Sequence, residues 1–323
     1  MNDRRTVEME EIFSGEIRSY TVGPEIAGQR LDRYLSDQEP EISRSYLQKL
    51  IREGNVLLDG KPAKAGAKLS CGAEIELMLP EAKEPEILPE KLPLDILYED
   101  SDVILINKPK GMVVHPSAGH YTGTLVNGLL CHCRGELSGI NGVLRPGIDH
   151  RIDKDTTGVL IACKNDRAHN SLAEQLKAHT ITRRYRAIVC GNLKEDEGRI
   201  DAPIGRHPIE RKKMAVVRTG GKSAVTHYRV LERFGAYTYI ECRLETGRTH
   251  QIRVHMASIG HPLLGDEVYG RGKNPFHLEG QTLHAMVLGF VHPSTGEYME
   301  FETPLPDYFE DILEKLRNSK TVR

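Results

Sequence analysis

The chain has 323 residues, of which 39% are hydrophobic and 28% are charged, and its formal net charge at pH 7 is −2. This length and balance allow two domains with apolar cores, and the near-neutral charge limits any contact with a polyanion to local basic patches. The sequence has no long apolar run and no apolar N-terminal core. We therefore expect a cytoplasmic protein without a membrane span.

The cysteines do not indicate a metal site. The six cysteines include no CxxC pair, and the cluster Cys131–Cys133 lacks a second ligand pair at zinc-site spacing. Scattered cysteines are typical of a reducing compartment. We therefore expect free thiols and no bound metal.

The first folded segment is predicted to begin with two short helices. Residues 1–15 are polar and acidic without a period, and are expected to be disordered. Apolar residues at helical spacing then mark one face of a first helix: Leu31, Tyr34 and Leu35. Ser43 is a suitable N-cap for a second helix over Arg44–Arg52, on which Arg44, Gln48 and Arg52 recur every four residues.

A hairpin follows these helices. Asp59-Gly60 favours a two-residue turn, and residues 74–79 alternate like a half-buried strand. This order of elements resembles the αL RNA-binding motif, which is named from a small-subunit ribosomal protein. The resemblance implies an RNA-binding domain over residues 16–80, with Arg44, Lys49 and Arg52 offered to phosphates. A solvated surface helix stays open as the alternative reading of the charge pattern.

Residues 81–94 are predicted to separate two domains. Three prolines and several charged residues indicate a semi-rigid, exposed linker. We place the second domain at residues 95–323.

The second domain reads as runs of strands with few helices between them. The predicted strands are 103–106, 158–163, 183–189, 224–231, 237–244, 283–291 and 299–303. The predicted helices are 124–130, 167–179, 249–259 and 308–316. In the helix that starts near Thr249, a possible cap, the spacing places Ile252, Met256 and Ile259 inward. This pattern predicts an α+β fold with a mostly antiparallel sheet.

A crowded polar segment precedes the buried strand 158–163. Arg151 and Asp153 are two residues apart, so an extended chain presents them on one face. A guanidinium and a carboxylate presented together at a strand entrance suggest a site. An ordinary charged turn remains the alternative for this segment taken alone.

A second charged segment is strongly basic. Between Gly205 and Lys222 it holds one acid, Glu210, and basic residues at positions 206, 211, 212, 213, 218 and 222. Such an excess suits phosphate contacts, for which we nominate Arg206, Lys212 and Lys213. A solvated loop is again the alternative.

Common cofactor and nucleophile motifs do not fit. Gly220-Gly221-Lys222-Ser223 lacks the leading glycine of a P-loop, and no GxGxxG or GxSxG motif is present. His250 and His255 are five residues apart, which is the wrong spacing for two metal ligands on one helix face. What remains is a carboxylate near arginines, a group that can act as nucleophile or base at a glycosidic carbon. A glycosidase with Asp149 or Asp155 as second acid is disfavoured by the absence of tryptophan.

Three segments resemble the signature segments of the RluA family of pseudouridine synthases. They are HRIDKDTTG with GVLIACKN, RRYRAIV, and ETGRTHQIRVHMASIGHPLLGD. The resemblance runs from about Pro93 to Pro304 and is strongest to the RluD type, which acts on large-subunit ribosomal RNA. Ile152 stands where the family more often has leucine.

The resemblance implies a role for each matching residue. Asp153 corresponds to the catalytic aspartate, and Arg253 to its salt-bridge partner. Tyr185 corresponds to the aromatic residue that stacks on uracil and assists proton removal from C5. Arg151 corresponds to the arginine that takes the place of the flipped base.

The resulting expectation is a cofactor-free, monomeric RNA pseudouridine synthase with ribosomal RNA as partner. The alternative from another class is a non-catalytic RNA-binding or ribosome-assembly protein that keeps the fold. The presence of Arg151, Asp153, Tyr185 and Arg253 disfavours it, since binding alone needs no such set.

Overall fold

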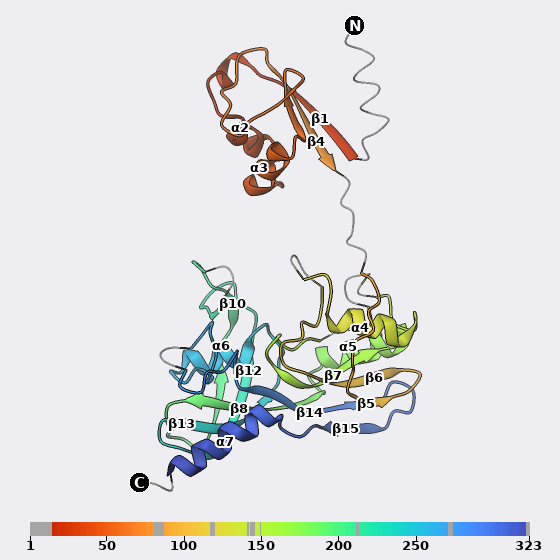
Figure 1. The fold of residues 1–323 in the computed structure, drawn as a ribbon, viewed down its shortest axis with the longest axis vertical. Helices are drawn as coiled ribbons and strands as arrows, with labels where there is room; N and C mark the ends of the chain where they lie inside the picture. Colours follow the sequence, from red (N-terminus) through yellow and green to blue (C-terminus); the bar gives the residue numbers. More distant parts are fainter. Residues whose placement is uncertain are drawn as a thin grey trace. The chain divides into compact units, whose positions relative to one another are not determined.

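The computed structural model describes residues 15–80, 87–116, 120–140, 142, 146–148, 150–210, 213–270 and 274–320. The chain divides into two compact units, Met1–Pro85 and Glu86–Arg323 (Figure 1). Each unit has a hydrophobic core of its own. Residues 1–14 of the segment expected to be disordered lie outside the described residues, and Gly15 already belongs to the first strand.

The first unit packs two helices against a small sheet. Its strands are β1 (Gly15–Thr21), β2 (Val56–Leu58), β3 (Lys61–Pro62) and β4 (Glu74–Pro80), in the order β1-β4-β2-β3. Its helices are η1 (Pro24–Ile26), α2 (Leu31–Gln38) and α3 (Arg44–Arg52). Both predicted helices are confirmed, and their apolar faces form the core with β2 and β4.

Local signals explain these boundaries. The Ser43 side chain accepts a hydrogen bond from the Tyr46 amide at 3.3 Å, which caps α3. Gly54 follows that helix with φ +83, in the left-handed region that glycine adopts without strain. Asp59 and Gly60 have φ values of 50 and 72, as a type I′ hairpin between β2 and β3 requires.

The predicted linker is wrong in its second half. Ile87 is 6% exposed and belongs to the core of the second unit. The Glu90 amide donates to the Asn127 carbonyl at 2.9 Å, and the Glu90 carboxylate accepts from the Gly123 amide. The prolines favour an extended chain, and its residues Ile87 and Leu94 pack into the core of the second unit, while Leu88 is exposed. That unit therefore begins near Glu86, whereas the sequence placed the boundary at residue 95.

The second unit is built on one large sheet. The order along this sheet is β5-β6-β7-β14-β8-β13-β12-β9, with β15 paired to β14, while β10 pairs with β11 separately. The strands are β5 (Ile96–Glu99), β6 (Val103–Lys108), β7 (Thr157–Cys163), β8 (Thr182–Cys190), β9 (Glu197–Asp201), β10 (Ile204–Arg206), β11 (Met214–Val216), β12 (Val225–Arg233), β13 (Tyr237–Leu244), β14 (Leu283–Val291) and β15 (Tyr298–Glu302). The helices are α4 (Leu125–Cys133), α5 (Asp166–Lys177), α6 (Gln251–Ser258) and α7 (Asp307–Lys320).

Strand pairing is antiparallel apart from the contact of β7 with β14. The parallel pair brings the two backbones close together at Gly158, where a Cβ would lie 2.1 Å from the Ala285 carbonyl oxygen. With φ +109, Gly158 is required both by this approach and by its own conformation. The predicted α+β class with a mostly antiparallel sheet is confirmed.

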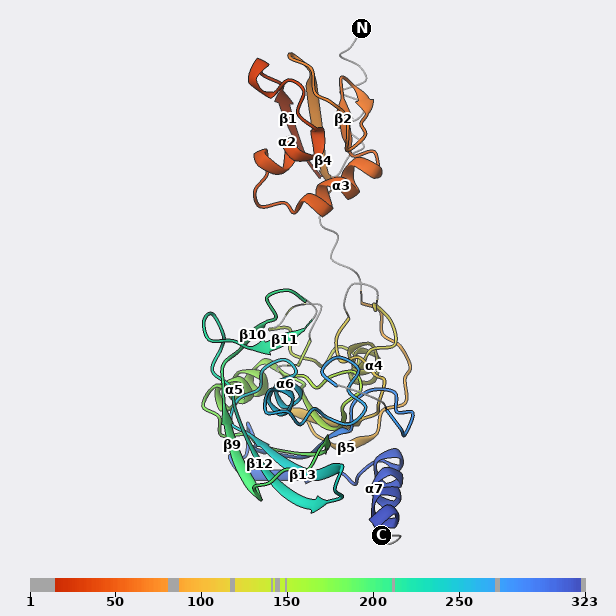
Figure 2. The same ribbon diagram turned by 90° about the vertical axis from the view of Figure 1, so that its left-hand side faces the viewer.

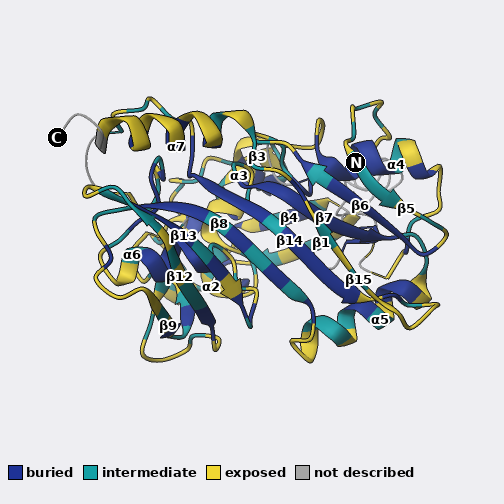
Figure 3. Cartoon of the chain, turned by 90° about the horizontal axis from the view of Figure 1, so that it is seen from below, coloured by how far each residue is buried: buried dark blue, intermediate teal, exposed yellow. Residues whose placement is uncertain are grey.

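Helices cover both faces of this sheet. In β6, Ile104 and Ile106 belong to the cluster that includes residues of α4 and α6. Val103 and Leu105, which alternate with them, belong to the cluster that includes residues of α5. A further cluster holds the buried side of α7, and the exposed side of α7 faces outward in Figure 3.

Two details of the second unit differ from the sequence-based expectation. The residue before α6 is His250 with φ 56, and no side chain caps the helix, so Thr249 is not the cap. Ile259 follows the end of α6 and is 39% exposed, whereas the helical spacing placed it inward.

The basic segment folds back as the β10–β11 hairpin (Figure 2).

Candidate active site

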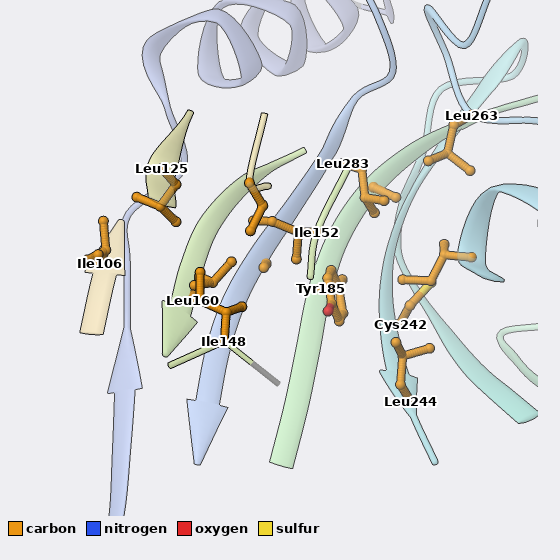
Figure 4. Packing of buried hydrophobic residues seen from close by; sticks show 14 of the residues in the cluster. Ile106, Leu125, Ile148, Ile152, Leu160, Tyr185, Cys242, Leu244, Leu263 and Leu283 are labelled. Atoms are coloured by element: carbon orange, nitrogen blue, oxygen red, sulfur yellow. The ribbon is translucent and has the colours of Figure 1, made fainter. Parts of the chain in front are cut away.

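A pocket of about 570 Å³ opens on the sheet face that α6 covers. It is lined from the segment before β7, from β8, from α5 and from the start of α6. The lining residues include His150, Arg151, Asp153, Lys177, Arg183, Tyr185, Gly247, Arg248, His250 and Arg253. Below them lies the large apolar cluster, where Tyr185 points from β8 beside Ile152 and Leu283 (Figure 4).

The segment before β7 presents its polar residues to this pocket. Ile152 is 5% exposed and packs in the core, and it lines the pocket together with Arg151 and Asp153 on either side. Arg151 and Asp153 therefore reach one pocket. That their side chains share one face of an extended chain stays a prediction.

This segment is held firmly by its surroundings. The Nζ of Lys108, which is fully buried, donates to the carbonyls of Pro109, Met112 and Lys154 at 2.9, 2.8 and 2.9 Å. The Thr156 amide donates to the Asp153 carbonyl at 3.0 Å. The backbone that directly follows the Asp153 side chain is therefore anchored, which limits its movement.

Asp153 forms an ion pair with Arg253. Arg253 Nη1 donates to Asp153 Oδ2 at 2.8 Å, and the guanidinium also grips Asp266 through Nε and Nη2 at 2.7 and 2.9 Å. Burial disfavours the charged form of Arg253, but the two carboxylates outweigh it and raise the pKa of the guanidinium. Asp266 thus fixes the arginine in the orientation that meets Asp153.

His250 approaches the other oxygen of the same carboxylate. Its Nε2 lies 3.7 Å from Asp153 Oδ1, and its Nδ1 lies 2.8 Å from the Tyr269 hydroxyl. That hydroxyl also accepts from the Met214 amide at 2.9 Å, which fixes the position of the tyrosine beside the imidazole. Burial lowers the pKa of His250, which favours the neutral imidazole.

Strand β8 contributes a tyrosine and an arginine to the pocket. Arg183 and Tyr185 are two residues apart on the strand, are 6% and 9% exposed, and line the pocket together. Burial raises the pKa of the Tyr185 hydroxyl, so it stays protonated at neutral pH. The structure therefore brings Arg151, Asp153, Tyr185 and Arg253 to one pocket.

The nominated RNA-binding residues of the first unit are in mixed environments. Arg44 donates to the buried carboxylate of Asp32 at 2.9 Å, as does Gln48, so this part of the predicted basic stripe serves the fold. Lys49 lies 3.8 Å from Glu53, and Arg52 is exposed. Their contact with RNA stays a prediction.

The basic hairpin carries the other nominated residues. Arg206 ends β10, and Lys213, just before β11, pairs with Glu210 at 2.7 Å. Lys212 lies outside the described residues. None of the described members lines the pocket.

One group of residues could hold a metal ion among those described. Asp100, Asp102 and His292 bring their ligand atoms together, but these atoms are already engaged. His292 Nε2 lies 2.8 Å from Asp100, and Asp102 accepts from Asn165 at 2.8 Å as well as from Ser294. The cluster reads as a hydrogen-bond network, and none of its members lines the pocket.

Several site residues were not found from the sequence. Asp266 ends one of the segments that resemble the family's signatures, but nothing in the spacing indicates that it binds Arg253. Lys108 reads as an ordinary charge after a strand, and its full burial appears only in the fold. Tyr269 and His250 act through contacts across 19 residues that no periodicity reports.

Comparisons with known proteins show to which family this two-domain chain, with its arginine-paired carboxylate and buried tyrosine, belongs. The family of RNA pseudouridylate synthases matches residues 102–258, and the S4 domain matches residues 29–75. The S4 match falls within the segment predicted as an RNA-binding domain.

Relatives with similar sequences extend over nearly the whole chain. The chain is 53% identical to an uncharacterised RNA pseudouridine synthase, YlyB, of Bacillus subtilis, over 93% of the chain and 98% of the relative. It is 48% identical to ribosomal large subunit pseudouridine synthase D of Zymomonas mobilis, covering 92% and 96%. Human RNA pseudouridylate synthase domain containing 1 has a similar structure, with TM-score 0.53 and 26% identity, covering 72% and 97%.

The chain belongs to the RNA pseudouridine synthase family. It is an isomerase that acts on RNA, with an S4 domain ahead of the catalytic domain. Among the helices of the described segments, none combines the length and apolar character needed to cross a bilayer.

Proposed function

We propose that this protein converts specific uridines of large-subunit ribosomal RNA to pseudouridine with Asp153 as the catalytic carboxylate. Relatives named ribosomal large subunit pseudouridine synthase D are 48% and 45% identical over more than nine-tenths of the chain, which supports this substrate. We also propose a cytoplasmic and monomeric enzyme, in which the pocket of one chain holds the whole set of nominated catalytic residues.

The position of Asp153 carries the proposal. One carboxylate oxygen is bound by Arg253, while the side chain remains 16% exposed at the pocket. An aspartate held in this way can attack the bound nucleotide as its N-glycosidic bond breaks. The detached uracil then turns and bonds to the ribose through C5, the bond between Asp153 and the nucleotide breaks, and the C5 proton is removed while N1 takes up a proton. Bonds are exchanged within one nucleotide, so the conversion has no net redox change.

Two further residues take part in this proposal. Tyr185 supplies an aromatic face at the bottom of the pocket for the uracil, and its neutral hydroxyl assists removal of the C5 proton by relay, passing its own proton to water as it takes up the one from C5. Arg151, exposed at the pocket edge, fills the place that the flipped base leaves in the RNA stack. Arg253 keeps Asp153 oriented for attack.

The basic residues outside the pocket would hold longer RNA. In the S4 unit these are Arg44, Lys49 and Arg52, and on the hairpin Arg206, Lys212 and Lys213. Contacts with phosphates supply affinity without reading sequence, so they would add to binding wherever the target uridine lies.

Pseudouridine mapping tests substrate and residue together. Total RNA would be mapped from cells lacking the gene and from cells complemented with wild type, Asp153→Asn or Asp155→Asn. We expect sites in large-subunit RNA that wild type and Asp155→Asn restore and Asp153→Asn does not. Sites confined to other RNAs would refute the substrate, and restoration by Asp153→Asn would refute the mechanism. Binding of RNA with no dependent site would favour a non-catalytic assembly factor.

A further inference from the structure

Arg183 is a buried cation that the proposed chemistry leaves without a role. It is 6% exposed, yet its one hydrogen bond among the described residues runs from Nη2 to the Glu245 carbonyl at 3.0 Å. Its Nε is buried without a partner in that part of the chain. Buried arginines are nearly always paired with a carboxylate, so this one is short of an anion.

The guanidinium faces the same pocket as Asp153. Arg183 shares its sheet face with Tyr185, and both line the pocket. A Cβ at Gly247 would lie 2.6 Å from Arg183 Nη1, although Gly247 does not have a positive φ. The guanidinium therefore lies directly over Gly247, and a side chain at that position would require the guanidinium to shift.

The surroundings of Arg183 are positive. Arg248 lines the pocket beside it, and its Nε donates to the Ser223 carbonyl at 2.9 Å rather than to an acid. Burial lowers the pKa of Arg183, and repulsion from Arg248 adds to the shift. Asp153 is the only acid among the described residues that line the pocket, and Arg253 already pairs with it.

We propose that Arg183, with Arg248 beside it, binds an RNA phosphate adjoining the nucleotide that enters the pocket. This inference rests on the proposed placement of the reaction at Asp153 and adds the anion subsite that positions the substrate. A phosphate next to the target nucleotide would set how deeply its base reaches towards Tyr185. The subsite would recognise the backbone, and so would serve any target sequence.

A phosphate fits this subsite better than a base carbonyl does. Two neighbouring guanidiniums repel each other, and a single anion placed between them removes that cost, whereas a neutral uracil oxygen does not. A planar guanidinium can also present N–H groups to two oxygens of one phosphate, which a single uracil oxygen does not offer. RNA carries such an anion on each side of every internal nucleotide.

The test replaces backbone phosphates one at a time. A synthetic stem-loop with a mapped target uridine would carry a neutral methylphosphonate at successive positions around that uridine. Binding would be measured in an Asp153→Asn background to prevent turnover. We expect one position to weaken binding about tenfold to a hundredfold, the range for loss of a charge-assisted hydrogen bond. Arg183→Gln should weaken binding of unmodified RNA similarly and show no further loss with the methylphosphonate.

Control variants test whether the loss of binding is specific to the charge of Arg183. Arg243→Gln, an exposed arginine of β13 outside the pocket, should keep the full response to the methylphosphonate. Arg183→Lys, which keeps the charge, should recover part of the affinity and of the response. Arg183→Gln should not lower the thermal midpoint of the free protein, since no buried carboxylate loses its partner.

Two results would overturn the proposal. One is an additive loss, in which Arg183→Gln remains fully sensitive to every methylphosphonate. The other is a wild-type response below about twofold at every position, which would show no such subsite. Turnover by the Asp153→Asn protein would instead refute the proposed mechanism, while the Arg183 comparison could still be made.

Discussion

Asp32 in the first unit and Asp153 in the second are both carboxylates bound by arginine, but they differ in how far the carboxylate stays exposed and open to a further partner. The Asp32 side chain is 0% exposed and accepts hydrogen bonds from Arg30, Arg44 and Gln48. These partners, Arg30 foremost, hold the pKa of Asp32 well below its usual range. Asp153 is 16% exposed and is bound directly by Arg253 at one oxygen.

The difference separates a structural carboxylate from a chemical one. A fully buried carboxylate that is bound at both oxygens joins elements, here α2 and α3, and lies out of reach of a substrate. A carboxylate held at one oxygen keeps its orientation and leaves the other oxygen for bond formation. The orienting arginine must then be fixed by something else, which is the part that Asp266 plays for Arg253.

Removing the carboxylate that fixes Arg253 should have the largest effect. Asp266→Asn leaves a buried guanidinium paired only with Asp153, so we expect unfolding free energy to fall by about 3 kcal/mol. Turnover should also fall, by about a hundredfold, since Asp153 loses its orientation. Urea unfolding and tritium release from 5-³H-uridine RNA would measure the two effects.

The matched control is Asp201→Asn. Its pair with Arg199 is half exposed on both sides, so the free energy of unfolding should change by less than about 0.5 kcal/mol. Full activity of Asp266→Asn would show that Asp153 needs no fixed arginine partner, and would contradict the role given to Asp266.

Asp32→Asn should affect stability alone and by a smaller amount. We expect a loss of about 2 kcal/mol in the first unit, because its arginine partners are half exposed and recover hydration. Turnover of a short RNA should remain at the wild-type level. Asp37→Asn, on the exposed side of the same helix, is the control for calorimetry. A turnover defect in Asp32→Asn would mean that the first unit takes part in catalysis.

Mild acid should lower the stability of the second unit but not that of the first, and this is the smallest of the expected effects. All 14 histidines follow residue 86, and burial lowers the pKa of both His150 and His284 to about 4. The unfolded chain binds protons there below about pH 6.5, while the folded chain does not until near pH 4. The second unit should therefore lose stability as pH falls through that window.

The first unit should hold its stability over the same range. It has no histidine, and the stabilising contribution of Asp32 persists above the unfolded pKa of about 3.9 and declines only below it. Calorimetry at pH 7 and pH 5 would follow both transitions, with Asp32→Asn identifying the first unit. Equal shifts of the two transitions would contradict this assignment.

Local patterns predicted most of the fold but few of its long-range contacts. Helix α3 and the turn at Asp59-Gly60 follow from capping and turn chemistry, which act over a few residues. The grouping of Asp153, Tyr185 and Arg253 came from the resemblance to known enzymes, because nothing local relates residues 100 apart. The basic stripe on α3 was read as an RNA surface, although Arg44 turns to an acid of the neighbouring helix.

The linker illustrates the same limit. Prolines and charges indicate an exposed, extended chain, and extension is what the composition controls. Whether such a chain then lies against a neighbour depends on Ile87 finding apolar partners, which only the folded unit supplies.

The burial of Lys108 makes its amine a reporter of opening in the active-site segment. Burial lowers the pKa of Lys108 to about 7 in the closed state, and an acylating reagent can reach the amine only once the segment opens. Three carbonyls and full burial shield it in the closed state. The rate of labelling at Lys108 would therefore report how often the backbone around Asp153 opens. A bound substrate that stabilises the closed segment would slow the labelling.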